Sequence, residues 1–255
     1  NKILKALGSP PLKQTEIEKS FAQMRGKIRP FVFETFELIN SAIDKNQKIL
    51  FEGAQGVFLD NDWGTYPFVT ASTILSGGIT GYAGVAPQKI KNVLGVAKAY
   101  ATRVGEGPFP TELLNSIGDK LRTEGNEYGA TTGRQRRCGW LDLELLRFAV
   151  KLNGFTNLAI TKLDVLDIFS EIKAATHYEY NGKKANYENL QTWELDKIKP
   201  VYKTFKGWQT STQGTTDFNK LPKEAQIYIK AIEKHLGIPI KFISTGSKRN
   251  ETIKI

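Results

Sequence analysis

Hydrophobic and polar positions along the chain form two different patterns, one typical of helices and one typical of buried strands. Four segments have apolar residues at spacings of three and four, which predicts helices over 16–24, 31–43, 141–152 and 222–235. Short runs rich in apolar and β-branched residues predict strands at 48–52, 92–103, 157–163 and 239–244. Helices and strands therefore alternate along the chain.

A β-hairpin is predicted after the third of these strands. Residues 171–180 and a second extended run flank Asn181 and Gly182, a dipeptide typical of two-residue hairpin turns. Alternating strands and helices indicate an α/β fold with a mainly parallel sheet flanked by helices, to which the hairpin is an appendage. The chain has no internal repeat or low-complexity linker, so we expect residues 1–255 to form a single α/β unit.

Unusual loops follow all four predicted strands. The loop at 53–84 is rich in glycine, and the others cover 104–111, 161–167 and 244–249. The carboxyl ends of parallel strands lie at one edge of a sheet, and ligands bind there in open α/β folds. We therefore expect the four loops to converge on one site.

Composition narrows the class of protein. Of 255 residues, 40% are hydrophobic and 24% charged, which is typical of a globular domain. One cysteine and two histidines exclude a disulfide framework and a structural zinc site, and His177 and His235 are expected to be structural. Without a signal-like segment or an apolar run of the ~20 residues that span a bilayer, we expect a soluble cytoplasmic protein without membrane partners. The net charge of +10 favours anionic partners.

Two of the loops offer groups that could recognise a purine base. Gln55 lies between small residues and could present its amide to a carbonyl or an oxyanion, although such a glycine loop is also consistent with simple turns. Asp164 follows a strand end, where its carboxylate could accept hydrogen bonds from guanine N1–H and N2–H while the Lys162 stem lies along the base. A surface Lys–Asp pair is the simpler alternative. Residues 244–246 could touch a base edge or form only a turn.

The segment 125–137 is the most basic loop of the chain. Thr131, Thr132 and three arginines lie close together, and we expect this donor array to have no acceptor charge beside it. Its natural partner is a small dianion or a dicarboxylate, because guanidinium groups bind carboxylates in pairs. The alternative is a mobile basic loop on the surface.

Taken together, six motifs resemble those of the adenylosuccinate synthetase family, and they cover essentially the whole chain. They are FEGAQG at 51–56, DNDWGTYPFVT at 60–70, KAYATRVGEGPFPTEL at 98–113, GNEYGATTGRQRRCGWLD at 125–142, TKLDVLD at 161–167 and ISTG at 243–246. The block at 125–142 is the most specific of them.

The resemblance implies a GTP-dependent, Mg²⁺-requiring ligase of purine (AMP) biosynthesis that joins IMP and L-aspartate through a 6-phosphoryl-IMP intermediate. Gln55 would act in catalysis by steadying the purine near O6. IMP would contact Gln55, Thr70, Val104 and Arg134. Aspartate would contact Ala130, Thr131, Thr132, Gly133, Arg134, Gln135 and Arg136. GTP would contact Arg136, Lys162, Leu163, Asp164, Ser244, Thr245 and Gly246.

The family also has an N-terminal part that includes a glycine-rich phosphate segment, a catalytic aspartate and histidine, and the Mg²⁺ ligands. We find none of these motifs in the chain, so we expect a carboxyl-terminal portion with an incomplete P-loop-NTPase-like fold, no metal ligands and no activity of its own. The resemblance further implies a homodimer that does not bind nucleic acid.

Two other classes of function remain open from the sequence. One is a non-catalytic guanine-nucleotide-binding or regulatory module that keeps the pockets without the chemistry. The other is a basic nucleic-acid-binding protein, whose affinity would fall steeply with salt and show little base preference.

Overall fold

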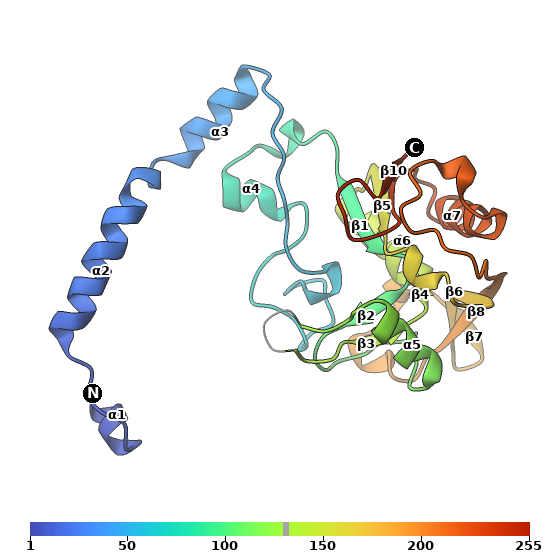
Figure 1. The fold of residues 1–255 in the computed structure, drawn as a ribbon, viewed down its shortest axis with the longest axis horizontal. Helices are drawn as coiled ribbons and strands as arrows, with labels where there is room; N and C mark the ends of the chain where they lie inside the picture. Colours follow the sequence, from blue (N-terminus) through green and yellow to red (C-terminus); the bar gives the residue numbers. More distant parts are fainter. Residues whose placement is uncertain (130–132) are drawn as a thin grey trace. The chain divides into compact units, whose positions relative to one another are not determined.

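The computed structural model describes residues 1–129 and 133–255, which group into two compact units (Figure 1). The first unit comprises residues 1–50 and 82–85, and the second comprises residues 51–81 and 86–255. Each unit is described separately below. The expectation that residues 1–255 form a single α/β unit stays a prediction.

The first unit is mainly helical, with α1 (Lys2–Ala6), α2 (Gln14–Ile28) and α3 (Thr35–Asp44). The two longer helices confirm the periodicity of the sequence, and their limits follow local signals. Pro30 lies in the 3-10 turn that separates them, and the Glu34 carboxylate caps α3 by accepting a hydrogen bond from Phe36 N at 3.0 Å. No residue of α1, α2 or α3 is buried.

A four-stranded sheet forms the centre of the second unit, in the order β1 (Leu94–Lys98), β5 (Asn157–Thr161), β9 (Ile240–Ser244) and β10 (Thr252–Lys254). The first three strands are parallel, and β10 is antiparallel to β9. The central strand β5 is buried along most of its length. This confirms the predicted mainly parallel sheet.

Two smaller sheets complete the second unit. The short strands β2 (Ala101–Arg103) and β3 (Arg137–Gly139) pair antiparallel. In the other sheet, β6 (Glu171–Tyr180) pairs with β4 (Leu141–Asp142), β7 (Lys183–Ala185) and β8 (Lys199–Lys206). The β6–β7 pair is the predicted hairpin, and its turn residue Asn181 has the positive φ of 50° that such a turn requires.

The remaining helices are α4 (Gly78–Ala83), α5 (Ser116–Glu124), α6 (Leu143–Asn153) and α7 (Lys223–Leu236). Short 3-10 turns lie at Arg29–Phe31, Val57–Leu59, Pro87–Lys89, Asp164–Leu166, Tyr187–Asn189, Thr192–Glu194 and Phe218–Lys220. Helix α6 begins where the Asp142 carboxylate accepts a hydrogen bond from Leu145 N, and it ends at Gly154 in the left-handed conformation. Helix α7 packs against α6 and β8 (Figure 1).

The main core lies between the parallel sheet and the helices. Tyr100, Leu158, Ile160 and Tyr228 are among its fully buried side chains. The Tyr228 hydroxyl donates to Ala99 O at 2.7 Å, so α7 is fixed directly to the residue that follows β1. This contact places the end of an edge strand in a defined position.

Two of the predicted strands were wrong in detail. Residues 48–52 form no strand, and Leu50 is 89% exposed, because none of the described residues pairs with this segment. Residues 92–103 form two strands in different sheets, and in β1 the side chain of Val96 is 70% exposed. β1 is therefore an edge strand of the described sheet rather than a buried one.

Burial of Asp142 gives the second unit a measurable pH dependence. The carboxyl caps the N-terminus of α6 and accepts a hydrogen bond from the Tyr178 hydroxyl at 2.7 Å, and its burial raises its pKa to about 7. Between pH 4 and 7 the folded state then holds a proton that the unfolded state has lost, so the stability contributed by Asp142 falls as pH rises through this range. Asp142→Asn removes this titration and keeps the cap.

We therefore expect the free energy of unfolding of the Asp142→Asn variant, relative to the unsubstituted protein, to increase from pH 4 to 7 by up to about 1.4 kcal/mol per pH unit. Chemical denaturation across this range measures the difference. A constant difference would contradict the assignment of the raised pKa to Asp142.

Candidate functional site

Three parallel strands end at one edge of the central sheet, as expected from the alternation of strands and loops. Lys98 is the last residue of β1, Lys162 follows β5, and Thr245 follows β9. Backbone hydrogen bonds join these strand ends, from Ala99 N to Thr161 O at 2.8 Å and from Leu163 N to Ser244 O at 3.1 Å. Two of the four expected loops, 161–167 and 244–249, therefore start from this edge, whereas the loop at 104–111 follows β2 of another sheet and, in the described part of the chain, no strand precedes the loop at 53–84.

A buried carboxylate gathers cations at this edge. Glu127 Oε1 accepts hydrogen bonds from Lys98 Nζ at 2.8 Å, Lys162 Nζ at 2.8 Å and the Tyr100 hydroxyl at 2.5 Å. Its other oxygen, Oε2, accepts from Arg136 Nη1 at 2.7 Å. The Glu127 side chain is completely buried. It thus connects the ends of β1 and β5 with the arginine-bearing loop.

The charges of this cluster fix its protonation. Burial alone would raise the pKa of Glu127, but hydrogen bonds from Lys162, Lys98 and Tyr100 outweigh burial and lower that pKa to about 2. Burial lowers the pKa of Lys98, and the Glu127 carboxylate opposes that shift. Burial and the charge of Glu127 raise the pKa of the Cys138 thiol to about 11, so this thiol is not a reactive one.

The expectation of an arginine array without an acceptor charge was wrong. Arg136 is paired with Glu127, and Arg137 forms a bidentate pair with Glu112 and donates to Gly107 O at 2.8 Å. Guanidinium groups held this close together repel one another, and a carboxylate beside each of these two offsets that repulsion.

The arginine-bearing loop is a short hairpin. Arg136 N donates to Glu127 O at 2.9 Å, Gly129 N donates to Arg134 O at 2.8 Å, and Tyr128 bridges to Gln135. Gly133 has the positive φ of 63° that its turn requires. The structure places Gly133, Arg134 and Gln135 at the exposed end of this hairpin. The predicted aspartate-binding residues Ala130, Thr131 and Thr132 lie outside the described residues.

Asp164 lines a polar cavity close to Lys162, which belongs to the Glu127 cluster. A cavity of about 590 Å³ is lined by Asp164, Asp167, Gln209, Thr210 and other residues with mostly polar side chains. Within the described part of the chain, the buried Oδ1 of Asp164 has no hydrogen-bond partner, and burial raises the pKa of this carboxyl. A buried acceptor without a partner is costly unless a ligand or water satisfies it.

Asp167 anchors the loop 208–212, which forms another part of the cavity wall. Its carboxylate accepts hydrogen bonds from Trp208 Nε1 at 2.6 Å, Thr212 N at 2.6 Å and Thr212 Oγ1 at 2.9 Å. Gln209, with a φ of 43°, and Thr210 lie between these two anchored residues. The loop beside Asp164 is therefore anchored at both ends by the Asp167 carboxylate.

The other residues predicted to bind a guanine base contribute mainly backbone. Leu163 and Thr245 are fully buried, and the Thr245 hydroxyl donates to Thr215 O at 2.8 Å. Ser244 Oγ donates to Gly246 O at 2.8 Å, and Ser244 O accepts from Leu163 N. Ser244, Thr245 and Gly246 thus lie beside the Lys162–Asp164 turn, with both hydroxyls already engaged.

Two residues predicted to bind a purine nucleotide also come together. Gln55 Nε2 donates to Thr70 Oγ1 at 3.1 Å, and Gln55 has a φ of 68°, a left-handed conformation that is uncommon outside glycine. Such a conformation in a loop is typical of a functional site. Below this loop, Asp60 is buried and accepts hydrogen bonds from Asp62 N, Trp63 N and Ile74 N.

Arg103 joins this glutamine-bearing loop to the arginine-bearing loop. Its guanidinium donates to Thr65 Oγ1 at 3.0 Å and to Phe68 O at 3.1 Å, and its strand β2 pairs with β3, where Arg103 lies opposite Arg137. Val104 follows β2 and is 54% exposed, so its side chain is accessible.

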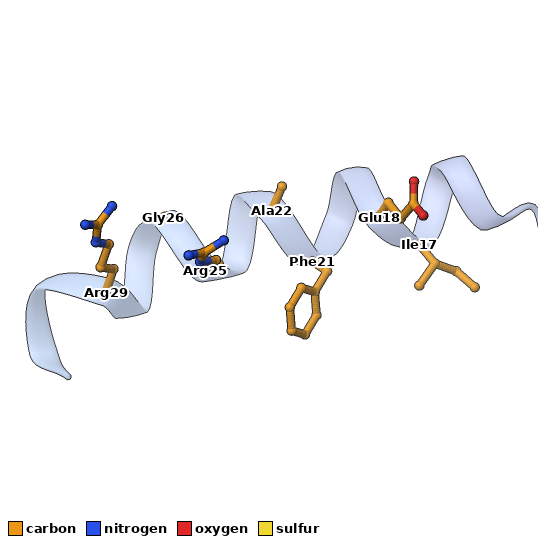
Figure 2. Close-up of a pocket in the computed structure, with 7 residues that line it drawn as sticks. All are labelled: Ile17, Glu18, Phe21, Ala22, Arg25, Gly26 and Arg29. Carbon is orange, nitrogen blue, oxygen red and sulfur yellow. The ribbon is translucent and has the colours of Figure 1, made fainter.

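A separate hollow of about 610 Å³ lies on the surface of α2 and is lined mainly by residues of that one helix rather than by convergent polar groups (Figure 2). Ile17 and Phe21 point to one side of the helix, and Arg29 points to the other. The lining of this hollow comes from α2 and Arg29, with no polar group of another described segment converging on it, so we assign no site to it. Among the described residues there is no cluster of acidic, histidine or cysteine side chains that could hold a metal ion, and no helix could cross a membrane.

Comparison with known proteins identifies the family. The sequence profile of the adenylosuccinate synthetase family matches residues 1–253. The chain belongs to the adenylosuccinate synthetase family.

Relatives in this family agree closely with the chain. The adenylosuccinate synthetases of Thermodesulfovibrio yellowstonii and Clostridium novyi are 49% and 44% identical over 99% and 100% of the chain. The structure of fully ligated adenylosuccinate synthetase from Plasmodium falciparum matches with a TM-score of 0.93 and 35% identity over 100% of the chain. The chain spans 60% of the length of the two bacterial relatives and 61% of the Plasmodium chain. The structural match confirms the predicted α/β fold class.

Sequence reasoning missed three residues of this candidate site. Glu127 and Asp167 lie inside two of the recognised motifs, GNEYG and TKLDVLD, but the sequence alone assigns no role to either carboxylate. Lys98 lies in a predicted buried strand and begins the motif at 98–113, but neither observation assigns it a role. The signal that could have found Glu127 is the excess of basic residues at the predicted strand ends, which requires an acidic partner once those residues are buried.

Substitution of Asp167 tests the construction of the cavity wall. Asp167→Ala leaves three donors without their acceptor, so we expect the free energy of unfolding to fall by about 3 kcal/mol and the Thr212 amide to exchange faster with solvent. Asp217→Ala is the control, since Asp217 accepts one backbone hydrogen bond at a turn, and we expect a loss of about 1 kcal/mol. Equal losses in the two variants would contradict the role of Asp167.

Proposed function

We propose that this chain carries substrate-recognition elements of a GTP-dependent ligase that joins IMP and L-aspartate to give adenylosuccinate. The observation that carries the proposal is the Glu127 cluster, because it brings Lys162 and Arg136, from separate segments, onto one carboxylate. Family membership supports the same function. A guanine nucleotide and a dicarboxylate can then be bound side by side.

Guanine recognition is assigned to the Lys162–Asp164 turn. The buried Oδ1 of Asp164 is an acceptor without a partner among the described residues, and guanine offers N1–H and N2–H donors that adenine lacks. The backbone of Leu163, Ser244, Thr245 and Gly246 would complete the base pocket.

Aspartate recognition is assigned to the segment 130–136, with Ala130, Thr131, Thr132, Gly133, Arg134, Gln135 and Arg136 as the contacts. Arg136 would also face GTP, and Arg134 would also reach IMP. An arginine fork binds a carboxylate with two parallel hydrogen bonds, which suits a substrate with two carboxylates.

IMP is assigned to Gln55, Thr70, Val104 and Arg134. The contact between Gln55 and Thr70 supports their placement in one pocket, where the Gln55 amide would steady the purine near O6. In the proposed path IMP loses its N1 proton to a base, the γ-phosphoryl group of GTP moves to O6 and GDP leaves. The aspartate amino nitrogen then attacks C6, phosphate leaves with the O6 oxygen, and the nitrogen loses a proton.

Mg²⁺ and GTP are the expected cofactor and co-substrate. The described residues do not form a Mg²⁺ site, so we derive no step through the metal. That residues 1–255 have no turnover of their own stays a prediction, as do a homodimer and a cytoplasmic location. Ultraviolet absorbance of adenylosuccinate, measured with the full-length protein, separates the ligase from a non-catalytic guanine-nucleotide module, and the same assay with residues 1–255 alone tests the predicted lack of turnover.

Nucleotide competition tests the assignment of Asp164. We expect the full-length protein to prefer GTP over ATP and expect Asp164→Ala to reduce that preference about tenfold or more, because a hydrogen bond to a charged group contributes about 1.5–3 kcal/mol. Displacement of a fluorescent guanine nucleotide by GTP or ATP measures the preference. Equal affinities for GTP and ATP in the unsubstituted protein, with a steep dependence on salt, would favour a basic nucleic-acid-binding protein instead.

A further inference from the structure

Glu127 connects the two segments to which the proposed function assigns GTP and aspartate. It lies at the base of the arginine-bearing hairpin, and its two oxygens hold Lys162 on one side and Arg136 on the other. We propose that Glu127 is a positioning residue that sets Lys162 and Arg136 for the binding of GTP and aspartate. This inference rests on the proposed function.

Arg136 depends on Glu127 more than the two lysines do. Among the described residues, Glu127 is the one acceptor for the Arg136 guanidinium, whose Nε is buried without a partner. Lys162 Nζ also donates to Gly125 O at 2.5 Å, and Lys98 Nζ also donates to Thr102 Oγ1 at 2.7 Å. Loss of the carboxylate would therefore release Arg136 first.

The cluster has a net positive charge, to which an anionic ligand can bind. One carboxylate faces three cations, so two positive charges remain, and the side chains of Lys162 and Arg136 are 34% and 30% exposed. Phosphate and carboxylate groups are the anions that arginine and lysine bind best in such a position. The cluster is thus suited to the substrates of the proposed ligase.

Glu127 has two opposite effects on such an anion. Its negative charge weakens the positive field, so a role limited to charge predicts tighter binding of GTP and aspartate when the charge is removed. Its hydrogen bonds fix the donors, so a positioning role predicts weaker binding. The sign of the change in affinity therefore separates the two roles.

The test measures steady-state kinetics of adenylosuccinate formation by the full-length protein with Glu127→Gln. We expect the KM values for GTP and L-aspartate each to rise about tenfold or more, the effect of losing a hydrogen bond to a charged group. The KM for IMP should rise less than the other two, since Gln55 and Thr70 form no bond to the cluster among the described residues and only Arg134, of the residues assigned to IMP, lies on the Glu127 hairpin.

Glu144→Gln is the matched control. Glu144 is a nearly buried carboxylate that is paired with Arg147 at 2.8 Å on α6, outside the proposed site. We expect this variant to lose stability without a selective change in any KM. Equal effects of the two substitutions on all three substrates would overturn the proposal, as would unchanged or tighter binding of GTP and aspartate in Glu127→Gln.

Glu127→Asp decides the question if Glu127→Gln does not fold. It keeps the charge but is one methylene shorter, so it cannot reach both Lys162 and Arg136. We expect the KM for aspartate to rise about tenfold, and an unchanged KM would overturn the proposal. If the unsubstituted protein forms no adenylosuccinate, the proposed function fails. If it is active and these variants bind GTP and aspartate normally, only the positioning role fails.

Discussion

The buried carboxylate of Glu127 is the interaction on which the arrangement of the site depends. Lys98, Lys162 and Arg136 repel one another, and without an acid between them they would separate into solvent. Burying a charge is costly, but four hydrogen bonds to the two oxygens compensate for the loss of water. The strand ends and the hairpin are therefore coupled through one side chain.

The parallel sheet determines where this carboxylate can act. β1 and β5 run side by side in the same direction, so Lys98 and Lys162 emerge at the same edge. Tyr228 fixes Ala99 from α7, and Ser244 fixes Leu163 from β9, so both lysines start from rigid positions. Asp167 has a comparable function in the neighbouring cavity, where it anchors the loop that carries Gln209 and Thr210. The chemistry of the site thus follows from strand direction and two buried carboxylates.

The sequence predicted the elements whose formation is signalled by residues close together in the chain. Helices α2, α3, α6 and α7 and the β6–β7 hairpin were found because amphipathic periodicity and turn residues are local signals. Residues 48–52 have the composition of a strand, but a strand needs a neighbour, and none of the described residues provides one. Strand β8 was missed because its lysines and Pro200 conceal the alternation, and pairing with β6 overrides this weak local preference.

In the site, too, the sequence predicted the features with a local signal, and it missed those that depend on long-range contacts. The strand-end rule correctly brought Lys162 and Ser244 together, and the contact between Gln55 and Thr70 agrees with their assignment to one ligand. The acid that organises the arginines could not be identified, since burial of Glu127 results from contacts with Lys98 and Tyr100, which are distant in sequence. Long-range ion pairing has no periodic signal in a loop.

The ionisation of Glu127 is the most direct test of this account, and it can be measured by following the side-chain carboxyl carbon of this residue in an NMR pH titration. The account predicts a pKa of about 2, so the carboxylate should stay ionised at every pH at which the protein remains folded. Titration between pH 4 and 6 would show that Lys98, Lys162 and Arg136 do not share this carboxylate, and the account would be contradicted.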